Sequence, residues 1–303
     1  MDKKLVHAAV AALGIMGAGA AQAAVTVPFA DVVVLMDESG SMAGEQAWIK
    51  PTITTLDGKL VTAGLTPNQY ASVGFGASAA TGPGLTRYFN VPGPGTSPNV
   101  AGLTRPFGTA ADFQTLGYTT SGSTEDGWAA INAANALSFR AGAGRNYILV
   151  SDENRDSTST SNTLTYAGVL ASLTSTGTLL NAIVDATFRC GSVTANVLGI
   201  DSDGTCYVAD GAGGYTTGAN GVAVSGSGIA DYVNLALASG GAAWNLNLLR
   251  AGGSTATSFT AAFVDIKVQE ITTPPGQIPE PSTYALMLAG LGLLGFMARR
   301  KRG

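Results

Sequence analysis

The feature that most constrains the fold is an uninterrupted apolar run, Val-Val-Val-Leu-Met, at residues 32–36. A short continuous run rich in valine is typical of a strand buried on both faces, as in a parallel sheet. Further strand candidates lie at residues 70–75, 85–89, 147–150, 179–184 and 243–248. They alternate with segments of helical spacing at residues 46–63, 125–139, 164–173, 229–238 and 258–268. The alternation predicts an α/β fold with a doubly wound, mostly parallel central sheet and helices on both faces.

One Gly-rich stretch, at about residues 188–228, interrupts this alternation and contains both cysteines, Cys190 and Cys206. We interpret it as a loop or small hairpin inserted into the fold. The 16-residue separation of the cysteines is too wide for a Cys-x-x-Cys pair and favours a structural disulfide. Residues 201–204, Asp-Ser-Asp-Gly, are similar to the start of a calcium loop, but Ala212 stands where the bidentate Glu belongs, so a polar turn is favoured.

Composition excludes several classes of function. Residues 24–282 carry 10 Lys and Arg against 19 Asp and Glu, because six of the 16 basic residues lie near the ends of the chain. A body this acidic has no electrostatic footprint for nucleic acid. The single histidine, His7, lies in the segment that we expect to be removed, which excludes His-dependent catalysis and His-based zinc sites in the mature protein.

The first 23 residues have the pattern of a secretory signal peptide. Lys3 and Lys4 precede an apolar run at residues 8–20, and Ala21-Gln22-Ala23 forms a small-x-small cleavage pattern. We expect cleavage after Ala23; a buried N-terminal helix is the alternative. Export makes a disulfide chemically allowed.

The last 25 residues have a comparable organisation. Pro279-Glu280-Pro281 is followed by an apolar segment at residues 284–298 and the basic residues 299–302. As a helix the apolar segment is about 22 Å long, which is short for a membrane span. The order of these parts resembles the PEP-CTERM sorting signal of Gram-negative bacteria. That resemblance implies transient anchoring in the inner membrane, processing by an exosortase, and delivery to the cell surface or extracellular matrix; a plain C-terminal transmembrane anchor is the alternative.

Three loops that follow strand ends or precede a helix carry oxygen ligands, at residues 37–41, 122–124 and 151–153. In a parallel sheet these loops converge on one edge. Carboxylates and hydroxyls without sulfur or imidazole suit a hard divalent cation, with Mg²⁺ first and Mn²⁺ or Ca²⁺ as alternatives.

The same pattern resembles the von Willebrand factor type A (VWA) domain and its metal-ion-dependent adhesion site (MIDAS). The Asp-x-Ser-x-Ser motif matches Asp37, Ser39 and Ser41, the threonine loop matches Thr124, and the distal acidic position matches Asp152. The resemblance implies that Ser39, Ser41 and Thr124 bind the metal directly. It implies that Asp37 and Asp152 act directly or through water.

Simpler roles for these residues remain open at this point. Ser41 and Thr124 could cap the helices that follow them. Further acids that the motif does not demand lie nearby, at Glu38, Glu125, Asp126 and Glu153.

The resemblance covers about residues 28–270 and gives the domain organisation. This comprises a signal peptide at 1–23, a VWA domain at 24–271 with the insertion at about 188–228, a Pro-rich linker at 272–283 and a sorting segment at 279–303.

We expect a non-enzymatic, exported surface or matrix protein that binds a protein or acidic polysaccharide through its divalent cation. One alternative is a structural matrix or biofilm component whose metal stabilises the fold. A remote alternative is a metal-dependent hydrolase.

Overall fold

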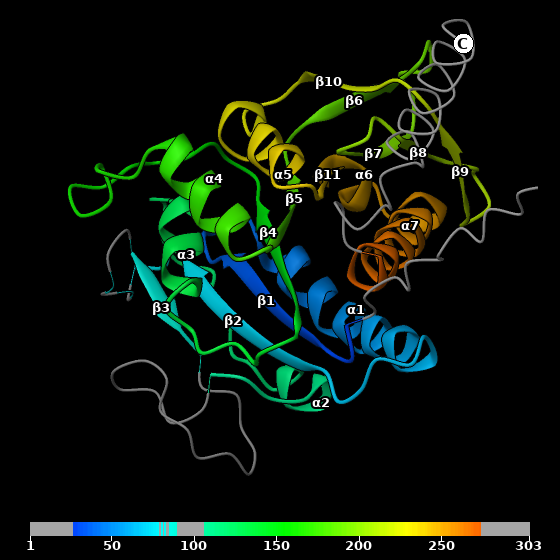
Figure 1. Cartoon of the computed structure of the whole chain (residues 1–303). Helices are drawn as coiled ribbons and strands as arrows, with labels where there is room; N and C mark the ends of the chain where they lie inside the picture. Colours follow the sequence, from blue (N-terminus) through cyan, green and yellow to red (C-terminus); the bar gives the residue numbers. More distant parts are fainter. Residues whose placement is uncertain (1–26, 79, 81, 83–84, 90–105, 274–303) are drawn as a thin grey trace, which may run out of the picture. The chain divides into compact units, whose positions relative to one another are not determined.

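Parallel strands form the centre of a nine-stranded sheet in the structure, which is a computed structural model (Figure 1). It describes residues 27–273 apart from residues 79, 81, 83–84 and 90–105. The parallel strands follow the order β2-β1-β4-β5-β11. Their bounds are Ala30–Asp37 (β1), Gln69–Phe75 (β2), Gly144–Ser151 (β4), Leu179–Val184 (β5) and Ala242–Asn245 (β11).

Strand β1 is buried along its whole length, as its continuous apolar run predicts. Parallel neighbours pair with both of its edges, and its side chains alternate between two apolar clusters. Val34 belongs to the same cluster as Ile49 and Phe259, whereas Val33 belongs to the cluster that contains Ile131. Alternation of this kind follows from the period of two residues in a strand.

The helices divide between the two faces of the sheet in the same way (Figure 1). Those whose buried residues join the first cluster are α1 (Ala43–Thr62), α2 (Ala110–Phe113), α6 (Leu246–Arg250) and α7 (Gly253–Thr272). Those of the second cluster are α3 (Gly127–Ala134), α4 (Tyr166–Ser175), η1 (Ile229–Val233) and α5 (Asn234–Ala238). The predicted doubly wound α/β architecture is therefore confirmed.

Antiparallel strands extend the sheet at both edges. Their bounds are Thr86–Tyr88 (β3, beside β2) and Val197–Asp201 (β7), Cys206–Ala209 (β8) and Tyr215–Gly218 (β9), which continue from β11. Strands β6 (Thr187–Cys190) and β10 (Gly221–Ser225) form a separate two-stranded ribbon. The interpretation of this stretch as a loop or small hairpin is wrong, because three of its strands continue the main sheet.

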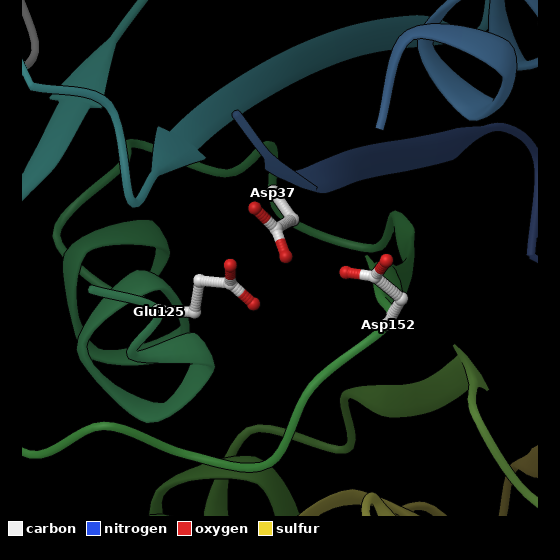
Figure 2. Close-up of side chains that lie close together, drawn as sticks. All are labelled: Asp37, Glu125 and Asp152. Atoms are coloured by element: carbon white, nitrogen blue, oxygen red, sulfur yellow. The ribbon is translucent and has the colours of Figure 1, made fainter. Parts of the chain in front are cut away.

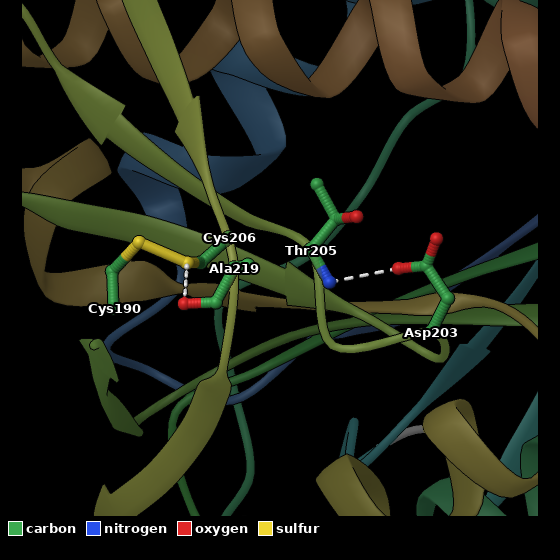
Figure 3. Close-up of a disulfide and its surroundings, with 5 residues drawn as sticks. All are labelled: Cys190, Asp203, Thr205, Cys206 and Ala219. Atoms are coloured by element: carbon green, nitrogen blue, oxygen red, sulfur yellow. Dashed lines mark hydrogen bonds between the residues drawn. A yellow bond between two sulfur atoms is a disulfide. The ribbon is translucent and has the colours of Figure 1, made fainter.

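The predicted disulfide is present and joins Cys190 of β6 to Cys206 of β8 (Figure 3). It therefore ties the two-stranded ribbon to the antiparallel extension of the main sheet. Gly218 on the neighbouring strand β9 makes room for it, because a Cβ atom there would lie 2.4 Å from the Cys190 sulfur.

Several predicted boundaries differ from the observed ones. The helix predicted at residues 125–139 is the shorter α3, and the one predicted at 229–238 begins with the π-helical turn η1. The strand predicted at 243–248 ends at Asn245, whose side chain accepts a hydrogen bond from the Asn247 N–H at 3.0 Å and so caps α6.

Within the described ranges, no helix is both long and apolar enough to cross a bilayer. The predicted signal peptide at residues 1–23 and the sorting segment at 279–303, with its apolar helix, lie outside those ranges.

Candidate metal centre

Three carboxyl groups converge at the carboxyl edge of the parallel strands. Asp37 is the last residue of β1, Asp152 directly follows β4, and Glu125 lies two residues before α3. Figure 2 shows the three side chains pointing toward one another from separate segments of the chain. One oxygen of each lies within 4.8 Å of the others. The structure thus brings together two of the predicted ligands and one acid that the motif does not demand.

Asp37 is fully buried and held by two hydrogen bonds. The Ser39 N–H donates to Asp37 Oδ1 at 2.8 Å, and the Ser151 hydroxyl donates to Asp37 Oδ2 at 2.8 Å. Because Ser151 ends β4, these bonds link the carboxyl ends of two adjacent strands. The Asp37 carboxylate is therefore fixed in place by the sheet itself.

The two serines of the first loop lie together beside Asp37. Their hydroxyl oxygens are 3.3 Å apart, and Ser39 is buried whereas Ser41 is exposed. The Gln46 amide donates to the Asp37 carbonyl at 3.2 Å and to the Thr119 carbonyl at 2.7 Å. These bonds tie the first loop to the segment that leads to Thr124.

The capping alternative for the hydroxyl residues is wrong. Helix α1 begins after Met42, and no described side chain caps it. Helix α3 is capped by Asp126, whose carboxylate accepts from the Ala129 N–H at 3.1 Å. Neither Ser41 nor Thr124 therefore serves as a helix cap.

Two glycines allow the loop that carries Thr124 to approach the end of β2. A Cβ atom on Gly122, whose φ is 141°, would lie 1.8 Å from the Gly76 carbonyl oxygen. A Cβ atom on Gly76, whose φ is 84°, would lie 3.4 Å from both Asp37 Oδ1 and the Thr124 carbonyl oxygen. Both φ values lie in the region that favours glycine, and at Gly122 the close approach also leaves no room for a side chain. The backbone of Thr124 is thereby placed beside the carboxyl cluster, half-buried.

Two buried oxygens in the cluster lack a hydrogen-bond partner among the described residues: Glu125 Oε2 and Asp152 Oδ1. A buried polar atom without a partner costs free energy, and two close together are unusual in a folded protein. A cation bound among the carboxylates would satisfy both. The donor set consists of oxygens and therefore fits a hard divalent cation.

Burial raises the pKa of both Asp37 and Glu125. For Glu125 the pKa rises to about 9, first because of burial and then because of the adjacent Asp37 carboxyl group. In the absence of a cation, the cluster therefore retains a proton at neutral pH.

The other acids near the motif have different roles. Glu38 forms an ion pair with Arg87, with Arg87 Nε 2.5 Å from Glu38 Oε2. Asp126 pairs with Arg155 at 2.8 Å, and Glu153 is exposed. Of these four extra acids, Glu125 is the one that joins the cluster.

Arg250, at the end of α6, also reaches the cluster, although the sequence does not predict it. Its Nη2 donates to Asp152 Oδ2 at 3.0 Å, and its Nε donates to Glu45 Oε1 at 2.7 Å. Because 98 residues separate Arg250 from Asp152 and no motif includes it, only the tertiary structure reveals this contact.

The second acidic segment, at residues 201–204, forms the turn between β7 and β8, as the polar-turn interpretation predicts. Asp203 Oδ1 accepts from the Thr205 N–H at 2.7 Å (Figure 3). Asp201 Oδ1 accepts from the Ser202 N–H at 2.6 Å, and its Oδ2 accepts from the Tyr207 hydroxyl at 3.1 Å. Hydrogen bonds of the turn thus occupy these carboxylates.

Comparison with known proteins gives one specific match. Residues 277–302 match the PEP-CTERM protein-sorting motif, which confirms the sequence-based prediction of that motif. The motif implies exosortase-type processing and export with transient membrane anchoring. No curated protein matches the chain.

Several solved structures are similar to part of the chain. Proximal thread matrix protein 1 from the mussel byssus is 17% identical with a TM-score of 0.34, over 52% of this chain and 38% of that one. The pilus adhesin SpaC from Lactobacillus rhamnosus GG is 12% identical with a TM-score of 0.35, over 52% and 25%. A second mussel structure has a zinc-occupied MIDAS motif, at 16% identity with a TM-score of 0.32, over 53% and 37%. The chain spans less than half the length of each of these proteins. At such low sequence identities and TM-scores, the similarity does not bear on function.

Proposed function

We propose that this chain is an exported binding protein that holds a divalent cation at the edge of its sheet and uses it to bind a partner. The predicted ligands are Asp37, Ser39, Ser41, Thr124 and Asp152. The observation that carries the proposal is the meeting of three carboxyl groups, two of which have a buried oxygen without a partner among the described residues. Glu125 joins the set as an additional candidate ligand.

The chemistry of the site favours adhesion over catalysis. Hydroxyl ligands leave the cation more residual positive charge than an all-carboxylate site would, and Ser41 borders solvent. A carboxylate from a protein or acidic polysaccharide could then complete the coordination. Mg²⁺ is the first candidate, with Mn²⁺ and Ca²⁺ as alternatives. This arrangement is what the resemblance to VWA domains implies.

Titration calorimetry with Mg²⁺ and Mn²⁺ on the purified full chain tests this proposal. We expect binding of one cation per chain, which Asp37→Ala abolishes. Asp203→Ala is the matched control, because Asp203 is an exposed acid in the β7–β8 turn. No binding by the wild type, or equal binding by Asp37→Ala, overturns the proposal.

A structural matrix component is the second candidate, because a bound cation would add a bridge between the three loops to the hydrogen bonds that already join them. Thermal melting with and without EDTA, beside a pull-down from matrix material, separates the two functions. A large loss of stability without a metal-dependent partner favours the structural role. Hydrolase activity, the remote alternative, is tested by a substrate screen with Mg²⁺, Mn²⁺ and Ca²⁺.

We propose that the cell exports the protein across the inner membrane of a Gram-negative bacterium. An exosortase then processes the tail that begins at Pro279-Glu280-Pro281, and the protein reaches the cell surface or matrix. Mass spectrometry of the mature protein tests this path. The expected chain begins after Ala23 and lacks the basic end at residues 299–302; a chain that retains that end contradicts the processing step.

A further inference from the structure

Arg250 connects three segments of the chain at the candidate metal centre. Its Nη2 lies 3.0 Å from Asp152 Oδ2, and its Nε lies 2.7 Å from Glu45 Oε1 in the first turn of α1. The same Nη2 also donates to the Ser41 carbonyl at 3.4 Å. The guanidinium group therefore contacts the loop after β4 and the first oxygen-rich loop while its own backbone ends α6.

These contacts fix the direction of the Asp152 carboxylate. One oxygen, Oδ2, accepts from Arg250, and the other, Oδ1, is buried in the cluster without a described partner. A carboxylate held by one oxygen has its second oxygen set in direction, because the group is planar. Figure 2 shows the Asp152 carboxyl group pointing toward those of Asp37 and Glu125. Because Oδ2 is bonded to Arg250, Oδ1 is the oxygen that remains available to a cation.

The positive charge of Arg250 repels a cation, and this repulsion acts against the gain from orienting Asp152. Glu45, whose side chain is 4% exposed, offsets that charge at 2.7 Å. The Arg250–Glu45 pair is therefore close to neutral as seen from the cation. Loss of a group that orients a metal ligand costs about 10-fold to 100-fold in metal affinity, and we expect this effect to exceed the remaining repulsion.

We propose that Arg250 is a positioning residue that holds Asp152 in its metal-binding orientation and so couples α6 to the cation. This inference rests on the proposed function, because it requires that a cation bind at the cluster. It concerns a residue that lies outside the five ligand positions of the motif, on a helix far from them in sequence.

Calorimetric titration of the full chain with Mn²⁺, together with circular dichroism of each variant, tests the inference. We expect Arg250→Gln to weaken Mn²⁺ binding about 10-fold or more. Arg250→Lys should weaken it less, because lysine keeps the charge but not the planar fork. The double variant Glu45→Gln/Arg250→Gln avoids an unpaired buried glutamate and should remain as weak as Arg250→Gln.

Arg140→Gln is the matched control. Arg140 also pairs with a buried carboxylate, that of Asp31, but at the opposite end of β1, about 20 Å from Asp37 by strand geometry. Its loss should lower stability and leave Mn²⁺ affinity unchanged. The melting shift produced by Mn²⁺ gives a second readout for any variant of reduced stability.

Each outcome has a defined meaning. If charge alone matters, Arg250→Gln binds Mn²⁺ more tightly than the wild type and Arg250→Lys binds equally, which overturns the inference. Unchanged affinity in folded Arg250→Gln also overturns it. If the wild type itself binds no cation, the proposed function fails instead.

Discussion

At the scale of single residues, the cluster brings together three carboxyl groups whose ionised forms are disfavoured by burial. Asp37 is fully buried, and Glu125 and Asp152 each have a buried oxygen without a described partner. Burial disfavours the charged form of each carboxyl group and proximity disfavours two charges together. A proton or a cation relieves both effects, so the two compete for the same site.

This competition predicts a pH dependence of cation binding. Because the pKa of Glu125 is about 9 without a cation, ligation by Glu125 requires loss of its proton. The apparent affinity should therefore rise with pH between about 6 and 9, by at most tenfold per pH unit for one proton. Calorimetry in buffers of different ionisation enthalpy should detect release of close to one proton at pH 7. Release of none would show that Glu125 stays out of the coordination shell.

The stability of the metal-free protein should show the opposite trend. A carboxyl group whose pKa is raised by folding binds more protons in the native state than in the unfolded state. The contribution of Glu125 to stability is therefore greatest at low pH and is lost as the pH rises from its unfolded value toward about 9. Urea unfolding in EDTA of wild type and Glu125→Gln should show a smaller pH dependence for the variant over this range, and equal dependence would contradict this account.

Glu125→Gln should also separate cation binding from folding. The amide mimics the protonated carboxyl group, so melting in EDTA at pH 7 should stay close to that of the wild type. Cation affinity should fall about tenfold, or about 1.4 kcal/mol, because one ligand charge is lost. Unchanged affinity would contradict the placement of Glu125 in the site. Asp203→Asn serves as a control for loss of an acid that is not in the cluster.

The sequence predicted part of the site because its motif residues flank strand ends. Asp37 and Asp152 follow recognisable apolar runs, and parallel strands bring such positions to one edge. Glu125 and Arg250 could not be assigned in this way. The position of Glu125 depends on the contacts of the 119–126 loop with residues 76 and 78, just after β2. Arg250 reaches the site through α6, which directly follows β11.

At the scale of elements, the site depends on how closely that loop approaches β2. Gly122→Ala places a Cβ atom 1.8 Å from the Gly76 carbonyl oxygen. The change should therefore destabilise the protein by about 2 kcal/mol or more and weaken cation binding. Gly117→Ala is the matched control, because a Cβ atom there meets nothing within 4 Å. Urea unfolding and calorimetry measure both effects, and similar behaviour of the two variants would count against this role of the loop.

The antiparallel extension of the sheet should behave independently of the metal centre. Replacing Cys190 and Cys206 with alanine opens a loop of 16 residues, which costs about 3 kcal/mol of stability by loop entropy. Cation affinity should remain unchanged, because the disulfide joins β6 to β8 and no candidate ligand lies on either strand. Denaturant unfolding measures the stability of the variant, and calorimetry measures its cation affinity. A parallel loss of cation affinity would mean that the extension supports the site.

The elements that the sequence predicted well are those with long apolar patterns. Strand β1 and helix α1 each carry a pattern long enough to identify from sequence. Strands β7, β8 and β9 have four or five residues each in a Gly-rich stretch, so their pairing comes from tertiary contacts. Strand β7 pairs with β11, and all three strands contact α7, which supplies what their local sequence lacks.

At the scale of the whole molecule, a cation that binds only the folded chain must stabilise it. At a Mn²⁺ concentration 100 times the dissociation constant, the gain is about 2.7 kcal/mol. For a domain of this size that corresponds to a rise in melting temperature of about 5 to 10 °C. Asp37→Ala should show no rise, and Asp203→Ala should show the full rise. Equal shifts in the two variants would place the cation elsewhere.

The match of residues 277–302 to the PEP-CTERM motif places this centre in an exported chain. The body that would be exported carries an excess of acidic residues. An acidic partner would therefore have to bind by direct coordination to an open position of a cation at this centre. The proposals at all three scales therefore depend on whether the cluster of Asp37, Glu125 and Asp152 holds such a cation.

Anomalous diffraction from crystals of the protein grown with Mn²⁺ is the measurement that tests this most directly. We predict one strong anomalous peak within coordination distance of oxygens from Asp37, Asp152 and the hydroxyl-bearing loops. A cluster without a peak, or a Mn²⁺ ion bound at another position while this cluster stays empty, would contradict it.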